Sequence, residues 1–330
     1  MTETLLKIEG LRTHFFTEAG VVKAVDNISF DLKKGESLGL VGESGSGKTV
    51  TALSVLGIVP KPGKIVDGKI EFNGVNLLEK TEKEMQSIRG SEIAIIFQDP
   101  SSSLNPVYNV ETQLRDVIMA HQNVSKAEAR QKVIELMGVV GIPEAETRMS
   151  EYPHQFSGGM KQRVAIARAL ACKPTLLFAD EPTTNLDVTI QAQILDLLSD
   201  LKRKFGMSLV MITHDMGIIA EMTTRIVVLY AGHVCEIAKT HDLFTHPRHP
   251  YTEALLAAVP RLDMRKTLRV IPGNIPNLIE PPTGCRFHPR CKYATPFCKE
   301  AIPVLEEVEQ EHFVACHEWR NIELKGESNQ

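Results

Sequence analysis

A glycine-rich turn between a predicted buried strand and a predicted helix is the feature that most constrains this chain. The strand is Ser37–Val41, and the turn that follows has eight residues: Gly42, Glu43, Ser44, Gly45, Ser46, Gly47, Lys48 and Thr49. Glycines let the backbone wrap closely around an anion, so that successive N–H groups and the helix N-terminus face phosphate oxygens. In this pattern the lysine supplies a positive charge to the β- and γ-phosphates, and the threonine hydroxyl is expected to bind Mg²⁺. The turn therefore predicts a phosphate-binding loop.

Short apolar runs that end in polar residues alternate with helical patterns along the chain. Besides Ser37–Val41, these runs are Glu92–Phe97, Thr175–Ala179 and Ser208–Thr213. The alternation is typical of an α/β protein with a mostly parallel sheet. Functional side chains of such sheets gather at the carboxyl ends of the strands, so the polar residues after these runs are candidates for a site.

Two carboxylates, Asp180 and Glu181, follow one of these runs. Asp180 is placed to hold Mg²⁺ directly or through water, and Glu181 to orient or deprotonate an attacking water. An acidic strand end is common by itself. Together with the phosphate-binding loop, it predicts hydrolysis of a nucleoside triphosphate.

A serine and two glycines, Ser157, Gly158 and Gly159, precede a predicted helix rich in small and basic residues. The serine can cap the helix, and the glycines leave the helix N-terminus open to an anion. This pattern alone is also that of an ordinary loop.

The part of the chain between the second and third runs is predicted to be helical, and the C-terminal part irregular. Ser125 and Glu128 form a capping box before an apolar stripe that includes Val133 and Met137. After about residue 258, prolines recur and no long periodic helix is visible. We therefore expect a helical insertion at about 99–165 and a second, smaller module at 259–330.

Four of the six cysteines lie near the C-terminus, at Cys285, Cys291, Cys298 and Cys316. Four thiolates suit a 4Fe–4S cluster or tetrahedral zinc. Their spacings of five and six residues are wider than those of common zinc knuckles, which favours the cluster. Zinc stays open as the alternative, as do free thiols or disulfides. The isolated Cys172 and Cys235 are interpreted as core residues.

Composition limits the classes of partner. The net charge is −4 and the pI about 6.3, so no basic surface for nucleic acid is expected. The apolar runs are far shorter than the ~18 residues that span a bilayer, and no secretory signal is visible. A role at a membrane would need other subunits to hold the protein there.

The order of these motifs over residues 5–258 resembles that of ABC ATPases, which are P-loop NTPases with antiparallel β and helical subdomains. The matching positions are the phosphate-binding loop, Gln98, Ser157–Gly159, Asp180, Glu181, Asn185, Asp187 and His214. The resemblance implies that ATP lies between the loop of one subunit and the Ser-Gly-Gly turn of another. The sequence departs from the family pattern in two places: Met160 stands where glutamine is usual, and Asn185 stands where alanine is common. Neither position supplies a catalytic group, so modest effects are expected.

The resemblance also implies roles for single residues. Gln98 would contact Mg²⁺ and couple the site to membrane subunits, and His214 would contact the γ-phosphate. Asp187 would communicate across the dimer. Phe15 would stack on adenine, with Phe16 as the alternative. Because Glu181 is intact, the subunit is expected to be catalytically competent.

The C-terminal sequence is similar to the extension of dipeptide and oligopeptide importer ATPases. The similarity rests on 248–252 and on the proline-rich stretch 276–291, together with 97–106 and 152–159. It implies peptide import, an iron–sulfur cluster, and a peripheral position on the cytoplasmic face of the membrane. The implied partners are two transmembrane permease subunits, a second, similar ATPase subunit and, indirectly, an extracytoplasmic substrate-binding protein.

Other functions share part of this pattern. Importers of nickel or sugars have much of the same motif set. ABC ATPases of DNA repair carry long coiled coils, whereas the 107 residues between Thr49 and Ser157 show no sustained heptads. Translation ATPases carry two ATPase halves in one chain, and a nucleotide-gated iron–sulfur sensor would not need Glu181. Transport is therefore the preferred interpretation.

Overall fold

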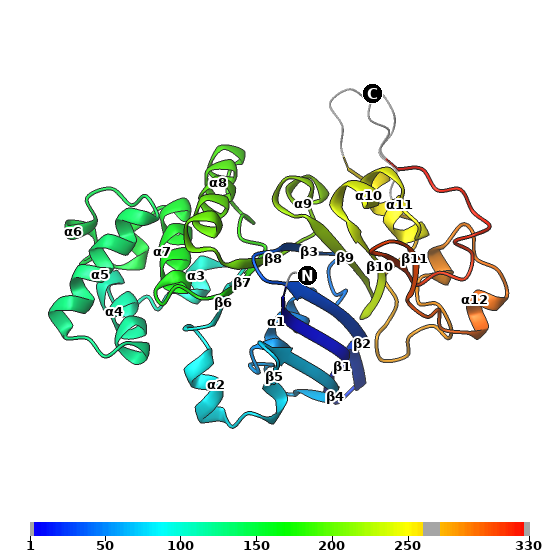
Figure 1. Ribbon diagram of the computed structural model, residues 1–330, viewed down its shortest axis with the longest axis horizontal. Helices are drawn as coiled ribbons and strands as arrows, with labels where there is room; N and C mark the ends of the chain where they lie inside the picture. Colours follow the sequence, from blue (N-terminus) through cyan, green and yellow to red (C-terminus); the bar gives the residue numbers. More distant parts are fainter. Residues whose placement is uncertain (1–2, 260–270, 327–330) are drawn as a thin grey trace. The chain divides into compact units, whose positions relative to one another are not determined.

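The computed structural model describes residues 3–259 and 271–326 and divides the chain into two compact units (Figure 1). The first unit joins the N-terminal residues 1–79 to the C-terminal residues 211–330. The second unit comprises residues 80–210. The partition falls inside strand β8 (Ser208–Thr213), through which the chain passes from the second unit into the first.

The first unit contains an antiparallel sheet near the N-terminus. Its strand order is β2-β1-β4-β5, and the bounds are β1 Thr4–Thr17, β2 Gly20–Lys33, β4 Gly63–Phe72 and β5 Val75–Asn76. Apolar side chains on one face of β1 and β2 form a core in which Leu6, Leu11 and Ile28 are completely buried. The antiparallel β part implied by the sequence is therefore present.

A second set of strands in the first unit carries the phosphate-binding loop. The strands follow the order β11-β12-β10-β9-β3, and their bounds are β3 Ser37–Val41, β9 Arg225–Tyr230, β10 His233–Lys239, β11 Glu306–Glu309 and β12 His312–Val314. β3 and β9 are parallel, and the remaining pairs are antiparallel. Every residue of β3 and β9 is buried, which explains why both read as continuous apolar runs.

Short helices complete the first unit. They are α1 Lys48–Val55, η1 Leu77–Glu79, α9 Met216–Met222, α10 Thr240–Thr245, α11 Pro250–Ala257, η3 His288–Arg290 and α12 Phe297–Glu300. No helix in the described parts of either unit is long and apolar enough to cross a membrane.

The second unit is mainly helical. Its helices are α2 Glu82–Ile88, α3 Pro100–Ser103, α4 Val110–His121, α5 Lys126–Val139, α6 Ala145–Arg148, η2 Pro153–Gln155, α7 Gly158–Leu170 and α8 Val188–Phe205. Two parallel strands, β6 (Ile93–Ile96) and β7 (Leu176–Asp180), flank the helical insertion. The predicted capping box of Ser125 and Glu128 is present at the start of α5. Helices α3 to α7 follow β6 and precede β7 in the sequence, in the region of the predicted insertion at about 99–165.

The C-terminal segment, defined here as residues 271–326, differs from the separate module that the sequence suggested. It contains only short elements, as expected, but β12 pairs with β10 and so extends the sheet of the first unit. The Phe287 ring packs 5.1 Å from Tyr230 and 5.2 Å from Tyr251, measured between ring centroids. These long-range contacts bury the segment against the unit that carries the loop. The boundary at residue 258 is therefore no boundary between compact units.

Candidate functional site

The phosphate-binding loop leaves the end of β3 and closes at the start of α1. Glycine is required at two positions of the loop, because the backbone of another segment lies too close for a side chain. A Cβ atom on Gly42 would lie 2.1 Å from the carbonyl oxygen of Leu229, and one on Gly47 would lie 2.6 Å from that of Ala24. Gly47 also has φ +101° and is the N-cap of α1, so it offers no side chain to the helix N-terminus. The backbone N–H groups of a helix N-terminus suit an anion.

Lys48 begins α1, and its ammonium group lies inside the loop. Its Nζ donates to the carbonyl oxygens of Gly42 and Glu43, at 2.7 and 2.9 Å, and to Ser46 Oγ at 3.3 Å. The side chain is buried, whereas Thr49, the next residue, is exposed. The loop thus holds a positive charge among its own carbonyl groups, close to the N-terminus of α1.

In the second unit, Gln98 and Thr184 contact Glu181 just after the end of β7. Asp180 is buried, and Glu181 follows it with φ 44°, a left-handed conformation that a glutamate seldom adopts. Glu181 Oε2 accepts hydrogen bonds from Gln98 Nε2 and from Thr184 Oγ1, both at 2.9 Å. Gln98 and Glu181 are therefore in direct contact. No sequence pattern singled out Thr184 by itself, although its position three residues after Glu181 could have indicated a contact between the two side chains.

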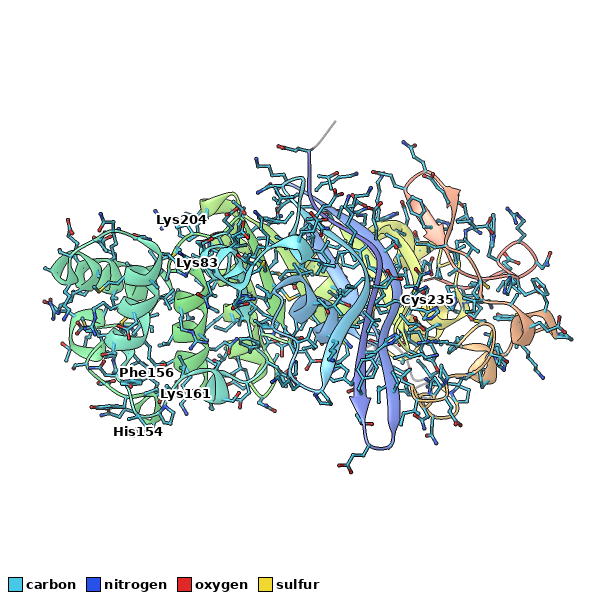
Figure 2. All side chains as sticks on the ribbon, turned by 90° about the horizontal axis from the view of Figure 1, so that it is seen from below. Lys83, His154, Phe156, Lys161, Lys204 and Cys235 are labelled. Carbon is cyan, nitrogen blue, oxygen red and sulfur yellow. The ribbon has the colours of Figure 1, made fainter. Side chains whose placement is uncertain are left out.

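The Ser-Gly-Gly turn begins helix α7. Ser157 is the N-cap, and its Oγ accepts a hydrogen bond of 3.4 Å from the N–H of Met160. Phe156 and Lys161, which flank the turn, are labelled in Figure 2. A Cβ atom on Gly159 would lie 2.7 Å from the Ile190 side chain, so glycine is needed there for packing as well. The serine cap predicted from the sequence is present.

Asp187 is the N-cap of helix α8. Its Oδ1 accepts a hydrogen bond of 2.9 Å from the N–H of Ile190. Asn185, two residues earlier, has φ 65°, a conformation that asparagine tolerates better than alanine does. The departure from alanine at this position therefore has a local structural reason.

His214 and Phe15 belong to the first unit, as does the loop. His214 is exposed at the end of β8, directly before Asp215, which caps α9. Phe15 lies in β1 opposite Gly63, where a Cβ atom would come within 2.7 Å of the phenylalanine ring. Phe16 is 46% exposed. The second unit contains the other predicted site residues, which are Gln98, Ser157–Gly159, Asp180, Glu181 and Asp187.

The four C-terminal cysteines line one small cavity in the first unit. All six cysteines of the chain are free thiols, and Cys235 is buried as predicted for a core residue. Burial raises the pKa of Cys285 to about 11 and that of Cys316 to about 12, so both stay protonated at neutral pH unless a cation binds them. Among the described residues, no group of three or more His, Cys, Asp or Glu side chains could hold a metal ion. The tetrahedral zinc arrangement is therefore not found in these parts of the chain.

Comparison with known proteins decides the family. A profile of the ABC transporter family matches residues 25–184, and a profile of the oligopeptide/dipeptide transporter C-terminal region matches residues 235–298. The dipeptide transport ATP-binding protein DppD of Escherichia coli is 48% identical over 314 residues, which cover 95% of this chain and 96% of the relative. The chain belongs to the family of ABC transporter ATP-binding proteins.

Further ABC proteins support this assignment. The oligopeptide transport ATP-binding protein OppD of Escherichia coli is 49% identical over 315 residues, 95% of this chain and 93% of the relative. A dimeric structure of the ATP-binding cassette MJ0796, in a post-hydrolysis state with ADP and Pi, has a TM-score of 0.64 and 27% identity. The aligned region covers 71% of this chain and 98% of that cassette. The predicted ABC ATPase fold and ATPase activity are thus confirmed.

Proposed function

We propose that this ABC ATPase energises the import of dipeptides or oligopeptides. The observation that carries the proposal is the match of residues 235–298 to the C-terminal region of oligopeptide/dipeptide transporters, because this region lies outside the part that ABC ATPases share. Relatives named for dipeptide and oligopeptide transport align over 95% of the chain. An ATPase subunit does not contact the cargo, so the peptide specificity belongs to its partners.

Each predicted site residue has a distinct task in the proposed reaction. The loop backbone and Lys48 bind the phosphates, and Phe15 stacks on adenine. Thr49, Gln98 and Asp180 would hold Mg²⁺, which neutralises charge on the phosphates when bound. Glu181 orients and deprotonates the attacking water, an assignment supported by the hydrogen bonds that hold its carboxylate in place. His214 would contact the γ-phosphate.

A second, similar ATPase subunit would complete the site. Its Ser-Gly-Gly turn would cover the nucleotide bound at this chain's loop, while Ser157–Gly159 of this chain would cover the partner's nucleotide. Asp187 would communicate between the two sites. ATP binding would close this pair, and hydrolysis would reopen it. Two permease subunits would hold the pair at the cytoplasmic face of the membrane, with a substrate-binding protein on the opposite side.

Glu181→Gln tests the proposed reaction. In the full transporter the variant should bind MgATP with normal affinity but lose turnover by about a hundredfold or more, because the general base is gone. Turnover at the wild-type rate would refute the role of Glu181. Reconstituted vesicles with the permease subunits and the binding protein then test the cargo. ATP-dependent uptake of a labelled tripeptide supports peptide import, whereas uptake of nickel or a sugar alone refutes it.

We also propose that Cys285, Cys291, Cys298 and Cys316 bind a 4Fe–4S cluster. The proposal is supported by the four thiols lining one cavity, since such a cluster takes one thiolate per iron and needs four thiols around a common space. Within the described residues no group of three or more His, Cys, Asp or Glu side chains could hold a metal ion, so the proposal rests on the shared cavity. The cluster would tie together a segment that has little regular structure of its own.

Metal and sulfide analysis of anaerobically purified protein tests this second proposal. We expect about four irons per chain with acid-labile sulfide and a brown colour. The iron, the sulfide and the colour should all be lost in a Cys291→Ser variant and kept in a Cys172→Ser variant, because Cys172 does not line the cavity. Zinc, or no metal, would refute the cluster and leave the ATPase function untouched.

A further inference from the structure

Glu43, the second residue of the phosphate-binding loop, is held by two residues from far along the chain. Its backbone N–H donates a hydrogen bond of 2.8 Å to Tyr251 Oη. Its carboxylate accepts two hydrogen bonds from Arg290, from Nη1 to Oε2 at 2.6 Å and from Nη2 to Oε1 at 3.0 Å. This bidentate pair fixes both the position and the orientation of the carboxylate. All three residues lie in the first unit.

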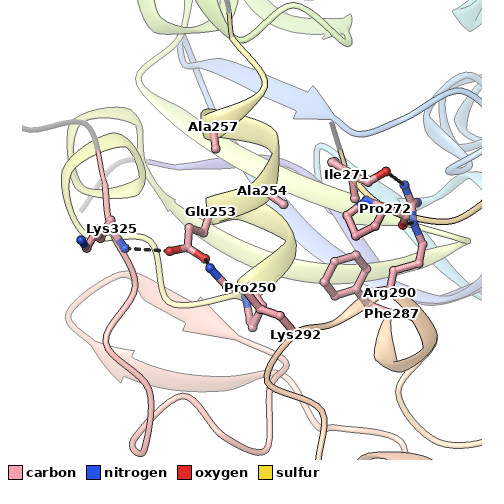
Figure 3. Close-up of a pocket in the computed structure, with 10 residues that line it drawn as sticks. All are labelled: Pro250, Glu253, Ala254, Ala257, Ile271, Pro272, Phe287, Arg290, Lys292 and Lys325. Carbon is pink, nitrogen blue, oxygen red and sulfur yellow. Dashed lines mark hydrogen bonds and ion pairs between the residues drawn. The ribbon is translucent and has the colours of Figure 1, made fainter. Parts of the chain in front are cut away.

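Arg290 is itself firmly positioned. Its side chain is only 4% exposed, and its Nε donates to the carbonyl oxygen of Pro272 at 2.8 Å. Nη1 also donates to Tyr230 Oη at 3.3 Å. Figure 3 shows Arg290 beside Ile271, Pro272 and Phe287 at the wall of a pocket of about 230 Å³. The guanidinium group therefore cannot leave Glu43 without breaking contacts on several sides.

We propose that Arg290 is a positioning residue for ATP binding, which acts through Glu43 to hold the phosphate-binding loop in its binding conformation. The inference rests on the proposed role of the loop. It gives the C-terminal segment a task in the nucleotide site, through the contact of Arg290 with Glu43. Tyr251 assists by fixing the Glu43 backbone.

Two physical effects favour this role. A carboxylate in a loop that binds a polyphosphate repels its ligand, and a paired arginine neutralises that charge. The loop also contains glycines with positive φ, which are easily displaced when nothing holds them. A single contact that removes repulsion and restricts the backbone should therefore raise nucleotide affinity more than it raises turnover of bound ATP.

The simpler alternative is that the pair only stabilises the fold. The first unit offers a matched control, the buried pair of Arg225 and Glu36. Arg225 is 9% exposed by its side chain and donates from Nε to Glu36 Oε1 at 2.9 Å and from Nη2 to Oε2 at 3.2 Å. This pair lies at the opposite end of β3 from the loop. Arg225→Ala removes a similar pair, together with the contact of Arg225 to Asp31, without touching the loop.

The test measures MgATP affinity of the full-length chain, and KM and kcat of the transporter that contains it. Arg290→Ala should raise Kd and KM for ATP about tenfold with little change in kcat, and Arg290→Lys should restore part of the affinity. Glu43→Gln should weaken binding less than Arg290→Ala does, because it removes the anchor to Arg290 but also removes the carboxylate that repels phosphate. The double variant should be no weaker than either single variant, because both act through one contact. Arg225→Ala should leave Kd and KM unchanged.

Three outcomes would overturn the proposal. They are wild-type affinity in Arg290→Ala, additive effects in the double variant, and an equal loss of affinity in Arg225→Ala. Lys48→Ala distinguishes a wrong role for Arg290 from a wrong location of the phosphate site. If Lys48→Ala abolishes ATP binding while Arg290→Ala does not change it, the loop is the phosphate site but Arg290 does not position it. If Lys48→Ala still binds ATP normally, the proposed site itself is wrong.

Discussion

The phosphate-binding loop and the C-terminal segment meet at Glu43, but they acquire their conformations in different ways. In the loop, eight consecutive residues form the turn and the start of α1, and contacts to distant residues then hold Gly42, Glu43 and Gly47 in place. In the C-terminal segment, short elements are held by contacts to residues more than 30 positions away, including Tyr230 and Tyr251. The first region can be recognised from a contiguous pattern, whereas the second depends on the completed fold.

Phe287→Ala should have the largest effect, and it should destabilise the C-terminal segment. Phe287 is 3% exposed and packs on Tyr230 and Tyr251, so its loss should lower the local free energy of unfolding of the segment by about 3–5 kcal/mol. Native-state hydrogen exchange of the amides in 285–291 measures this effect. Phe297→Ala is the control in the same segment, since Phe297 is 54% exposed. Equal destabilisation by both variants would contradict the importance of the aromatic cluster.

Gly42→Ala should damage the loop rather than the segment. The new methyl group would meet the Leu229 carbonyl oxygen at 2.1 Å, so the loop must shift, and ATP affinity should fall by about a hundredfold, or ~2.7 kcal/mol. Equilibrium binding of a fluorescent ATP analogue measures the loss. Gly35→Ala provides the control, because Gly35 also has positive φ (75°) but no atom within 4 Å of the added Cβ. That variant should lose only stability, by about 1 kcal/mol, and an affinity loss there would show that general destabilisation explains both results.

Lys292→Ala should have the smallest effect. Lys292 follows Cys291 directly, as Arg290 precedes it, and its Nζ pairs with Glu253 at 2.9 Å. The lysine side chain is 59% exposed, so the pair should contribute less than about 1 kcal/mol to stability. Urea unfolding and ATP binding should both be close to wild type. A loss of ATP affinity as large as that of Arg290→Ala would mean that any change beside Cys291 disturbs the site.

Several parts of the fold were predictable because short-range physics determines them. β3 and β8 have the expected bounds, and the caps of Ser125, Ser157 and Asp187 start helices α5, α7 and α8. The first two caps were expected from the sequence, whereas Asp187 had been assigned only a role between subunits. The attachment of the C-terminal segment to β10 was not predictable, because β11 and β12 are too short to give a strand pattern.

The sequence by itself determined the family, the phosphate-binding loop and the acidic pair at the end of β7. Each of these depends on residues next to one another, where the backbone allows few conformations. Only the tertiary structure decided that Glu181 is held by Gln98, 83 residues away, and Glu43 by Tyr251 and Arg290, 208 and 247 residues away. A contact over such a distance depends on how the intervening elements pack, and no local pattern encodes that packing.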